Sequence, residues 1–268
     1  MNVVCVTYRC KDFNKLKRDI TSLFPKGFVL NQCVIVDTDD DIEINSELIQ
    51  SSSVNSFFEF SGFNYGLELL SSLEGNHVGD VLFINDTIFE HHYVNAYRSE
   101  LAWYIKEVRG RHSGLYIYGK PQNKFHGVII PTCFFVLNID GSDVNYFIDE
   151  NLITKLKGLS IKRGCFNVDS LFISDELVYN ERLNGWLKPK SFLKGWYKAS
   201  PYTELSKETF ERKSLTIYLE HRLCHRIREF GGVVLESRNV KNDFLFFIDR
   251  LYQLRIKFFA RIRARLRT

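Results

Sequence analysis

Residues that can bind a nucleotide follow three short apolar runs of this chain, at the point where each run ends. Aspartates can hold ribose hydroxyls or a hard divalent cation, a tyrosine ring can stack on a base, and an arginine can offset phosphate charge. Together these are the groups that a nucleoside diphosphate needs. The alternative interpretation is that the positions are polar only because loops are polar. The residues are Thr7, Tyr8 and Arg9 after the first run, Asp37 after the second, and Asn85 and Asp86 after the third.

Five near-continuous apolar runs predict strands that are buried on both faces of a sheet, and helical spacing of apolar residues predicts helices between and after them. Their alternation predicts an α/β fold with a Rossmann-like, mostly parallel central sheet and flanking helices. Because ligands of such sheets bind outside the carboxyl ends of the strands, we expect the polar residues above to meet at one edge. The predicted strands are residues 2–7, 32–36, 80–84, 115–118 and 128–137, and the predicted helices are residues 12–24, 62–73, 90–108, 207–230 and 242–266.

The composition is that of an ordinary globular protein: 45% of the 268 residues are hydrophobic and 25% are charged. Six cysteines are scattered without a CxxC pair, which favours reduced thiols over a disulfide framework or a zinc cluster. The amino-terminal residues lack the features of a secretory signal, and no apolar run reaches the length of about 18 residues typical of a membrane span. We therefore expect a cytoplasmic protein.

The positive charge of the chain is concentrated at its carboxyl-terminal end. Seven Lys and Arg residues against one acid give residues 249–268 a net charge of +6, so the first 248 residues carry −2 of the total of +4. This charge distribution disfavours a protein that grips nucleic acid along a whole face. Apolar and basic residues interleave in residues 249–268, which predicts a basic amphipathic helix for peripheral association with an anionic membrane surface. The alternatives are a helix packed on the core with its arginines in water and a nucleic-acid-binding arm.

Five segments together resemble the GT-A glycosyltransferases that use nucleotide sugars to build bacterial surface polysaccharides such as O-antigen and capsule. The resemblance rests on the order and spacing of VVCVTYR, VIVDTDDD, SGFNYGLELL, VLFINDTIF and LEHRLCHRIREFG, and it covers most of the first 135 residues and a short stretch near residue 220. It implies a nucleotide-sugar donor, expected to be a UDP- or dTDP-sugar. It also implies that Thr7, Tyr8, Arg9 and Asp37 contact the nucleoside and that Ser61, Gly62 and Asn64 lie under the nucleotide and the sugar.

Asn85, Asp86 and Thr87 stand where the family has an Asp-any-Asp motif for a divalent cation and the sugar diphosphate. The motif is reduced here to one carboxylate, which can hold Mg²⁺ or Mn²⁺ with phosphate oxygens and water as further ligands. The sequence therefore predicts Asp86 as the metal ligand and leaves the dependence on metal open. The alternative role for Asp86 is an N-cap of the following helix, assisted by Thr87.

Transfer of a sugar with inversion requires a carboxylate that removes the proton of the acceptor hydroxyl. The segment that begins at Leu219 resembles a family segment with an acid at the start of a helix beside the acceptor cleft, which makes Glu220 the first candidate for this base. Asp175, which follows an apolar run, is the second. Either acid can instead be a solvated side chain without a catalytic role, and a retaining enzyme would need no such base.

The resemblance implies a hexosyltransferase-like enzyme that moves a sugar from a nucleotide sugar to a lipid-linked saccharide at the inner face of the cell membrane, with inversion expected. Residues 1–240 would form the glycosyltransferase domain, divided into a nucleotide-sugar half (1–135) and an acceptor half (136–240), and residues 241–268 the membrane-associated helix. The alternatives are another nucleotide-using transferase, such as a nucleotidyltransferase, and a non-catalytic membrane-associated module. A glycine-rich phosphate loop after the first strand would favour a nucleotidyltransferase, and the sequence has none there.

Overall fold

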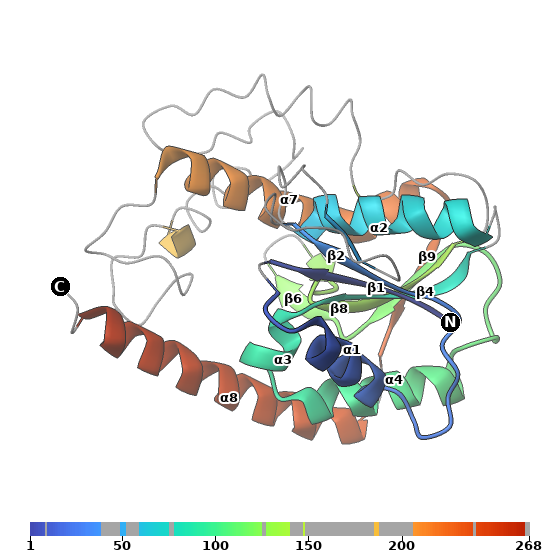
Figure 1. Ribbon diagram of the computed structural model, residues 1–268, viewed down its shortest axis with the longest axis horizontal. Coiled ribbons are helices and arrows are strands. Elements are labelled where there is room, and N and C mark those ends of the chain that lie inside the picture. Colours follow the sequence, from blue (N-terminus) through green and yellow to red (C-terminus); the bar gives the residue numbers. More distant parts are fainter. Residues whose placement is uncertain are drawn as a thin grey trace.

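The computed structural model describes residues 1–8, 10–38, 49–51, 59–74, 78–124, 127–139, 147, 185–187, 206–237 and 240–265. Two of the predicted site residues, Arg9 and Asp175, lie outside this set. In the described residues the chain forms an α/β structure in which one mixed sheet lies between two layers of helices (Figure 1).

The central sheet has seven strands in the order β3-β2-β1-β4-β8-β5-β9. Its pairings are parallel except for the two made by β8, which runs antiparallel to β4 and to β5. The other six strands therefore point the same way, which confirms the prediction of a mostly parallel sheet. Strands β6 and β7 form a separate antiparallel hairpin. The strands are β1 (Asn2–Thr7), β2 (Cys33–Asp37), β3 (Ile49–Ser51), β4 (Gly79–Asn85), β5 (Tyr116–Gly119), β6 (Gln122–Lys124), β7 (Gly127–Ile129), β8 (Phe134–Ile139) and β9 (Val233–Glu236).

The helices cover both faces of the sheet. Helices α2 and α7 lie on one face, and α1, α3, α4 and α8 lie on the opposite side (Figure 1). This arrangement gives the three layers that an alternating strand and helix order predicts. The helices are α1 (Phe13–Ser22), α2 (Glu59–Glu74), α3 (Thr87–His91), α4 (Val94–Glu107), α7 (Lys207–Glu229) and α8 (Val240–Arg265).

Strand β1 is buried along its whole length and contributes to the core on both sides of the sheet. Val4 and Val6 belong to the core that contains α2 and α7, whereas Val3 and Cys5 belong to the core that contains α1 and α4. The four central residues of the strand therefore alternate between the two cores, which explains why they are all apolar. Helix α2 approaches the strand closely through glycine, because a Cβ atom on Gly66 would lie only 2.4 Å from Cγ1 of Val4.

Two of the predicted elements are each divided in two. The predicted strand 128–137 contains part of β7 and most of β8, separated by a turn at Pro131, which has no amide hydrogen with which to continue a ladder. The predicted helix 90–108 contains the end of α3 and all of α4, because the Tyr93 amide between them donates to Asp249 at 2.6 Å and not to a helical carbonyl. Strands β3, β6 and β9 were not predicted, since three or four residues carry too little periodicity.

Helix α8 is held on the body of the protein by buried polar side chains. Asp249, which is 2% exposed, accepts from the Tyr93 amide at 2.6 Å and from Nε2 of Gln253 at 2.8 Å, and its Oδ2 lies 3.1 Å from Nδ1 of His92. One turn from the start of the helix, Nδ2 of Asn242 donates to the buried Glu100 carboxylate of α4 at 2.6 Å. The carboxyl-terminal helix therefore packs on α3 and α4 through these hydrogen bonds.

Burial by itself would raise the pKa of Asp249, but hydrogen bonds from His92, the Tyr93 amide and Gln253, together with the charge of His92, outweigh it and lower the pKa. A lowered pKa in the folded state means that the carboxylate stabilises the fold above its unfolded pKa of about 3.9 and loses this effect as the pH falls through the folded value.

We predict that Asp249→Asn lowers the free energy of unfolding by about 2 kcal/mol at neutral pH, the range for a hydrogen bond to a charged group. Thermal unfolding followed by circular dichroism measures the change, and the difference between variant and wild type should shrink in acid below about pH 4. Asp243→Asn on the exposed first turn of α8 is the matched control and should change stability little. Equal effects of the two substitutions would contradict the prediction.

Candidate functional site

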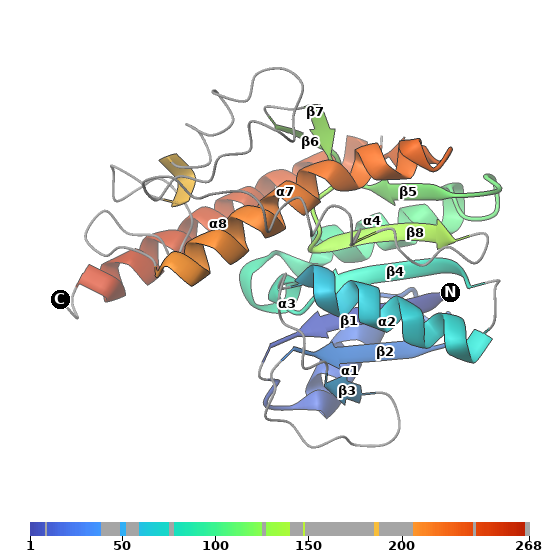
Figure 2. The same ribbon diagram turned by 90° about the horizontal axis from the view of Figure 1, so that it is seen from above.

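The strand order reverses direction between β1 and β4, and the site lies at this point. From β1 the chain passes through α1 on one face to β2, and from β3 it passes through α2 on the other face to β4 (Figure 2). In an open sheet of parallel strands the helices then diverge on opposite sides of the carboxyl ends and leave a crevice for a ligand. Thr7 at the end of β1 and Asn85 at the end of β4 lie at this point of the sheet.

Thr7 and Asp86 are hydrogen-bonded to each other where β1 and β4 end. Oγ1 of Thr7 donates to Oδ2 of Asp86 at 2.5 Å, and the Asp86 amide donates to the Val6 carbonyl at 3.0 Å. The Tyr8 backbone amide is a further donor to the Asp86 carboxylate. Two residues that are 79 positions apart in the chain are therefore fixed side by side, as the sequence predicted for the strand ends.

The Asp86 carboxylate has a perturbed pKa. Burial raises its pKa and the negative charges of Glu90 and Asp37 raise it further, whereas the hydrogen bonds from Thr7 and the Tyr8 amide lower it by less. The alternative role of a helix cap is wrong: Asp86 occupies the N-cap position of α3, but its side chain makes no capping hydrogen bond. Instead Oδ1 of Asn85 accepts from the Thr87 amide at 3.0 Å. A partly buried carboxylate next to other acids is an arrangement that a cation or a hydrogen-bond donor of a ligand would stabilise.

Asp37 and Tyr8 lie at the same edge but differ in exposure. Asp37 is fully buried, and its Oδ2 accepts from the Cys10 amide at 2.8 Å, so it fixes the start of the loop between β1 and α1. Tyr8 is 55% exposed. The Tyr8 side chain is therefore accessible from solvent at this edge, whereas the Asp37 carboxylate is not.

Helix α2 begins at this edge and packs Gly62 against Val6 of β1 and against Thr38, which follows β2. A Cβ on Gly62 would lie 2.7 Å from both γ carbons of Val6 and 3.3 Å from Cγ2 of Thr38. The glycine is thus required by the contact between helix and strand. Ser61 is buried, and Asn64 donates through Nδ2 to Oε1 of Glu68 at 2.6 Å.

The side-chain oxygen of Asn64 has a different environment from its amide nitrogen. Its Oδ1 is buried and has no hydrogen-bond partner among the described residues. A buried carbonyl oxygen without a donor costs about 1–3 kcal/mol. A ligand hydroxyl or amide that reached this oxygen would remove that cost, which is consistent with the predicted role of Asn64.

Glu220 reaches the same edge from α7, at the beginning of β8. Its Oε1 accepts from the Thr132 amide at 3.3 Å, and Oγ1 of Thr132 donates to Oε1 of Glu59 at 3.4 Å. The next residue in the turn, Cys133, accepts through its carbonyl from the Asn85 amide at 3.2 Å. The turn thus connects Glu220 and Glu59 to the end of β4, next to Asp86.

Glu59 and Thr132 were missed by the sequence analysis. Glu59 is the first residue of α2, and an acid in the first turn of a helix is expected whether or not it has a function. Thr132 follows a proline inside an apolar run that was interpreted as one strand. Neither residue carries a local signal for a site, because their proximity to Glu220 depends on tertiary contacts.

The thiol of Cys133 is not an activated nucleophile. Burial, with a smaller contribution from the negative charges of Glu220 and Asp249, raises the pKa of Cys133 to about 12. A thiol reacts as its thiolate, which is scarce at neutral pH in this environment. Chemistry at this edge therefore rests on its carboxylates and hydroxyls.

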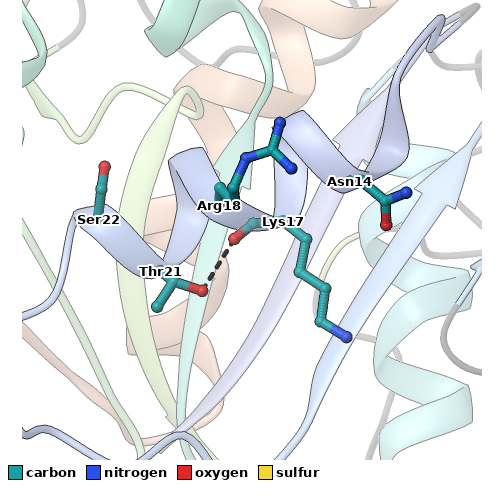
Figure 3. Close-up of a pocket in the computed structure, with 5 residues that line it drawn as sticks. All are labelled: Asn14, Lys17, Arg18, Thr21 and Ser22. Atoms are coloured by element: carbon teal, nitrogen blue, oxygen red, sulfur yellow. Dashed lines mark hydrogen bonds between the residues drawn. The ribbon is translucent and has the colours of Figure 1, made fainter.

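A hollow on the described surface lies elsewhere. It has an open volume of about 620 Å³ and is lined by Asn14, Lys17, Arg18, Thr21 and Ser22 (Figure 3). All five side chains come from α1 and spread outward from it, and the marked hydrogen bond runs from Oγ1 of Thr21 to the Lys17 carbonyl at 2.8 Å. A hollow on one helix surface lacks the convergent groups of a binding site.

Comparisons with protein-family models, with curated proteins and with solved structures found no match. Among the described residues there is no group of three or more His, Cys, Asp or Glu side chains that could hold a metal ion. No helix in the described part of the chain has both the length and the apolar character to cross a membrane.

We predict that Asp86→Asn stabilises the protein at neutral pH by about 1 kcal/mol or less. Because the pKa is raised in the folded state, the charged carboxylate lowers the free energy of unfolding. This loss of stability disappears fully only below the unfolded pKa of about 3.9. Thermal unfolding at neutral and acidic pH measures the effect, and the gain should disappear in acid. Asp19→Asn on α1 is the matched control. A variant that is less stable than wild type at neutral pH would contradict the prediction.

We also predict that Gly62→Ala destabilises the protein by about 1–2 kcal/mol through overpacking against Val6. Val6→Ala in the same chain should recover part of this loss, because it makes room for the added methyl group. The four chains of this double-mutant cycle are compared by thermal unfolding. Additive effects of the two substitutions would show that the helix and strand are not in tight contact here.

Proposed function

We propose that this chain is a GT-A type glycosyltransferase that transfers a sugar from a nucleotide sugar. The observation that carries the proposal is the joining of Thr7, Asp86 and the exposed Tyr8 at the point where the strand order reverses, with Glu220 held at the same edge by the Thr132 turn. A nucleotide site and a general base beside each other are the two requirements of sugar transfer. The resemblance of the surrounding segments to glycosyltransferases agrees with this arrangement.

The donor site uses groups that are already in place. Tyr8 stacks on the base through its exposed ring, and the orphan oxygen of Asn64 accepts a hydrogen bond from the donor. Asp86 would hold a divalent cation together with phosphate oxygens and water. Burial and the neighbouring acids raise the pKa of Asp86, and a bound cation would stabilise its charged form. The cation supplies charge neutralisation for the diphosphate. Arg9 and Asp175 belong to the proposal as predicted residues outside the described part of the chain.

Glu220 acts as the general base in this proposal. Its carboxylate takes the proton of the acceptor hydroxyl as the hydroxyl oxygen bonds to the anomeric carbon, and the bond from that carbon to the diphosphate breaks. The nucleoside diphosphate leaves, and the configuration at the anomeric carbon of the transferred sugar is inverted. The Thr132 amide orients one oxygen of Glu220, and Glu59 adds negative charge that favours the protonated form after transfer.

The acceptor and the place of action follow from the resemblance. We propose a lipid-linked saccharide as acceptor and a peripheral position at the inner face of a cell membrane, with residues 1–135 binding the donor and residues 136–240 the acceptor. A hexosyltransferase-like reaction with a UDP- or dTDP-sugar is the expected form.

We predict that UDP or dTDP raises the melting temperature of the purified chain, whereas CMP does not. A ligand present at about 100 times its Kd stabilises the folded state by about 2.7 kcal/mol. A thermal-shift series with UDP, dTDP, GDP and CMP, each with Mg²⁺, with Mn²⁺ and without metal, measures this. The metal-dependent part of the shift should be lost in Asp86→Asn, with Asp19→Asn as control. No shift with any nucleotide in a folded sample would contradict the proposal.

We predict that Glu220→Gln keeps the nucleotide-induced thermal shift but slows turnover by about 100-fold or more, the usual contribution of a general base. The release of nucleoside diphosphate during donor hydrolysis, in which water replaces the acceptor, provides the assay. Glu229→Gln, an exposed acid near the end of the same helix, is the matched control. Turnover equal to that of the control would exclude Glu220 as the base.

A further inference from the structure

Helix α8 packs on the protein through a side that combines buried polar residues with Leu245 and Phe246, and it presents a second, apolar side to solvent. Its buried residues include Asn242 and Asp249, which bond to α3 and α4. On the opposite side, exposed apolar residues recur at separations of four, three, four, three and four positions, which places them in one row along the helix. We call this row the α8 stripe. Its members are Val240, Phe244, Phe247, Leu251, Leu254 and Phe258, with exposed fractions of 79, 65, 54, 51, 62 and 48%.

The extent of the α8 stripe differs from the sequence expectation. The sequence analysis predicted the membrane-binding helix at residues 249–268. The stripe begins earlier, at Val240, in the part of the helix that Asn242 bonds to α4. Three large apolar side chains, Phe244, Phe247 and Leu251, are therefore exposed on two helix turns whose other side is hydrogen-bonded to the body of the protein.

Basic side chains flank the stripe. Arg250 and Arg255 are exposed on either side of it, and the Arg255 guanidinium lies 5.9 Å from the ring centroid of Phe259. One exposed acid, Asp243, precedes them, and it pairs with Lys120. An apolar row with arginines on both edges requires a partner that is apolar in the middle and anionic at its rim.

The arginines beside the α8 stripe distinguish between two possible partners, a second copy of the helix and a lipid surface. The spacing of the stripe also suits a coiled coil between two copies of α8, but pairing two such stripes would bring arginines against arginines at the flanking positions. An anionic lipid surface satisfies both features: the apolar side chains enter the boundary between headgroups and acyl chains, and the guanidiniums reach the headgroups.

We propose that the α8 stripe is a docking face for an anionic lipid surface. The buried polar network holds the helix so that the stripe faces outward before any lipid is met, and docking therefore requires no rearrangement of the helix. The carboxyl-terminal half of α8 extends past the carboxyl ends of the strands in both views (Figures 1 and 2). If the proposed function holds, docking brings the candidate site to the membrane side, where a lipid-linked acceptor is found.

Flotation of the full chain with lipid vesicles tests the proposal. Wild type should bind vesicles of phosphatidylcholine mixed with phosphatidylglycerol, bind vesicles of phosphatidylcholine alone at least about tenfold more weakly, and leave the mixed vesicles at high salt. The double variant L251Q/L254Q should bind the mixed vesicles at least about tenfold more weakly than wild type, because two apolar side chains no longer enter the lipid. V29Q/L73Q, which changes two apolar residues outside α8 that are at least as exposed as Leu251 and Leu254, is the matched control and should bind as wild type does.

Equal binding by the two double variants, or equal binding of wild type to neutral and anionic vesicles, would overturn the proposal. So would sedimentation of wild type as a dimer that L251Q/L254Q converts to a monomer without lipid, since the stripe would then be a contact between copies. The release at high salt is measured with wild type alone. Thermal unfolding of both double variants verifies that they fold. Vesicle binding is measured without nucleotide and the thermal shift without vesicles, so the failure of one proposal is distinguished from the failure of the other.

Discussion

The burial of β1 between two helix layers is the constraint on which the rest of the structure depends. The four central residues of β1, Val3 to Val6, can all be buried only if helices cover both faces of the sheet. Val4 and Val6 belong to the core that contains α2, and Val3 and Cys5 to the core that contains α1, so the crossovers from β1 to β2 and from β3 to β4 lie on opposite faces. The two crossovers therefore separate at the carboxyl ends of the strands. The polar residues Thr7 and Asp86 lie there because the apolar strands end there.

Two aspartates show how the same side chain serves different purposes. Asp249 is surrounded by donors from His92, Tyr93 and Gln253, and its pKa is lowered, so its charge stabilises the attachment of α8. Asp86 has fewer donors and other acids nearby, and its pKa is raised, so its charge costs stability. A protein gains nothing structurally from such a carboxylate, and residues of this kind are common where a ligand completes the environment. The contrast supports a binding role for Asp86 and a structural one for Asp249.

The parts of the fold that were predictable are those in which local pattern and tertiary packing agree. β1, α1 and α7 follow from apolar periodicity within one or two residues of their predicted ends, since each buries a continuous face. The division of 90–108 into α3 and α4 was not predictable, because it depends on Asp249, more than 150 positions away. In the site, Thr7 and Asp86 were predictable from strand ends. The approach of Glu59 to Thr132 was not, and the role of Gly62 in helix packing became visible only when Val6 was placed against it.

Helix α8 shows why amphipathicity read from a sequence leaves its orientation open. An apolar row on a helix is normally assigned to the core, and the arginines to solvent. Here the polar residues Asn242 and Asp249 are the ones that find buried partners, because α3 and α4 offer a backbone amide, a histidine and the Glu100 carboxylate at the right separations. Once these contacts form, rotating the helix to bury its phenylalanines would leave buried polar groups without partners, at a cost of about 1–3 kcal/mol for each. The network on one side of the helix therefore fixes the exposure of the other side, and the apolar surface that results needs a partner outside the chain.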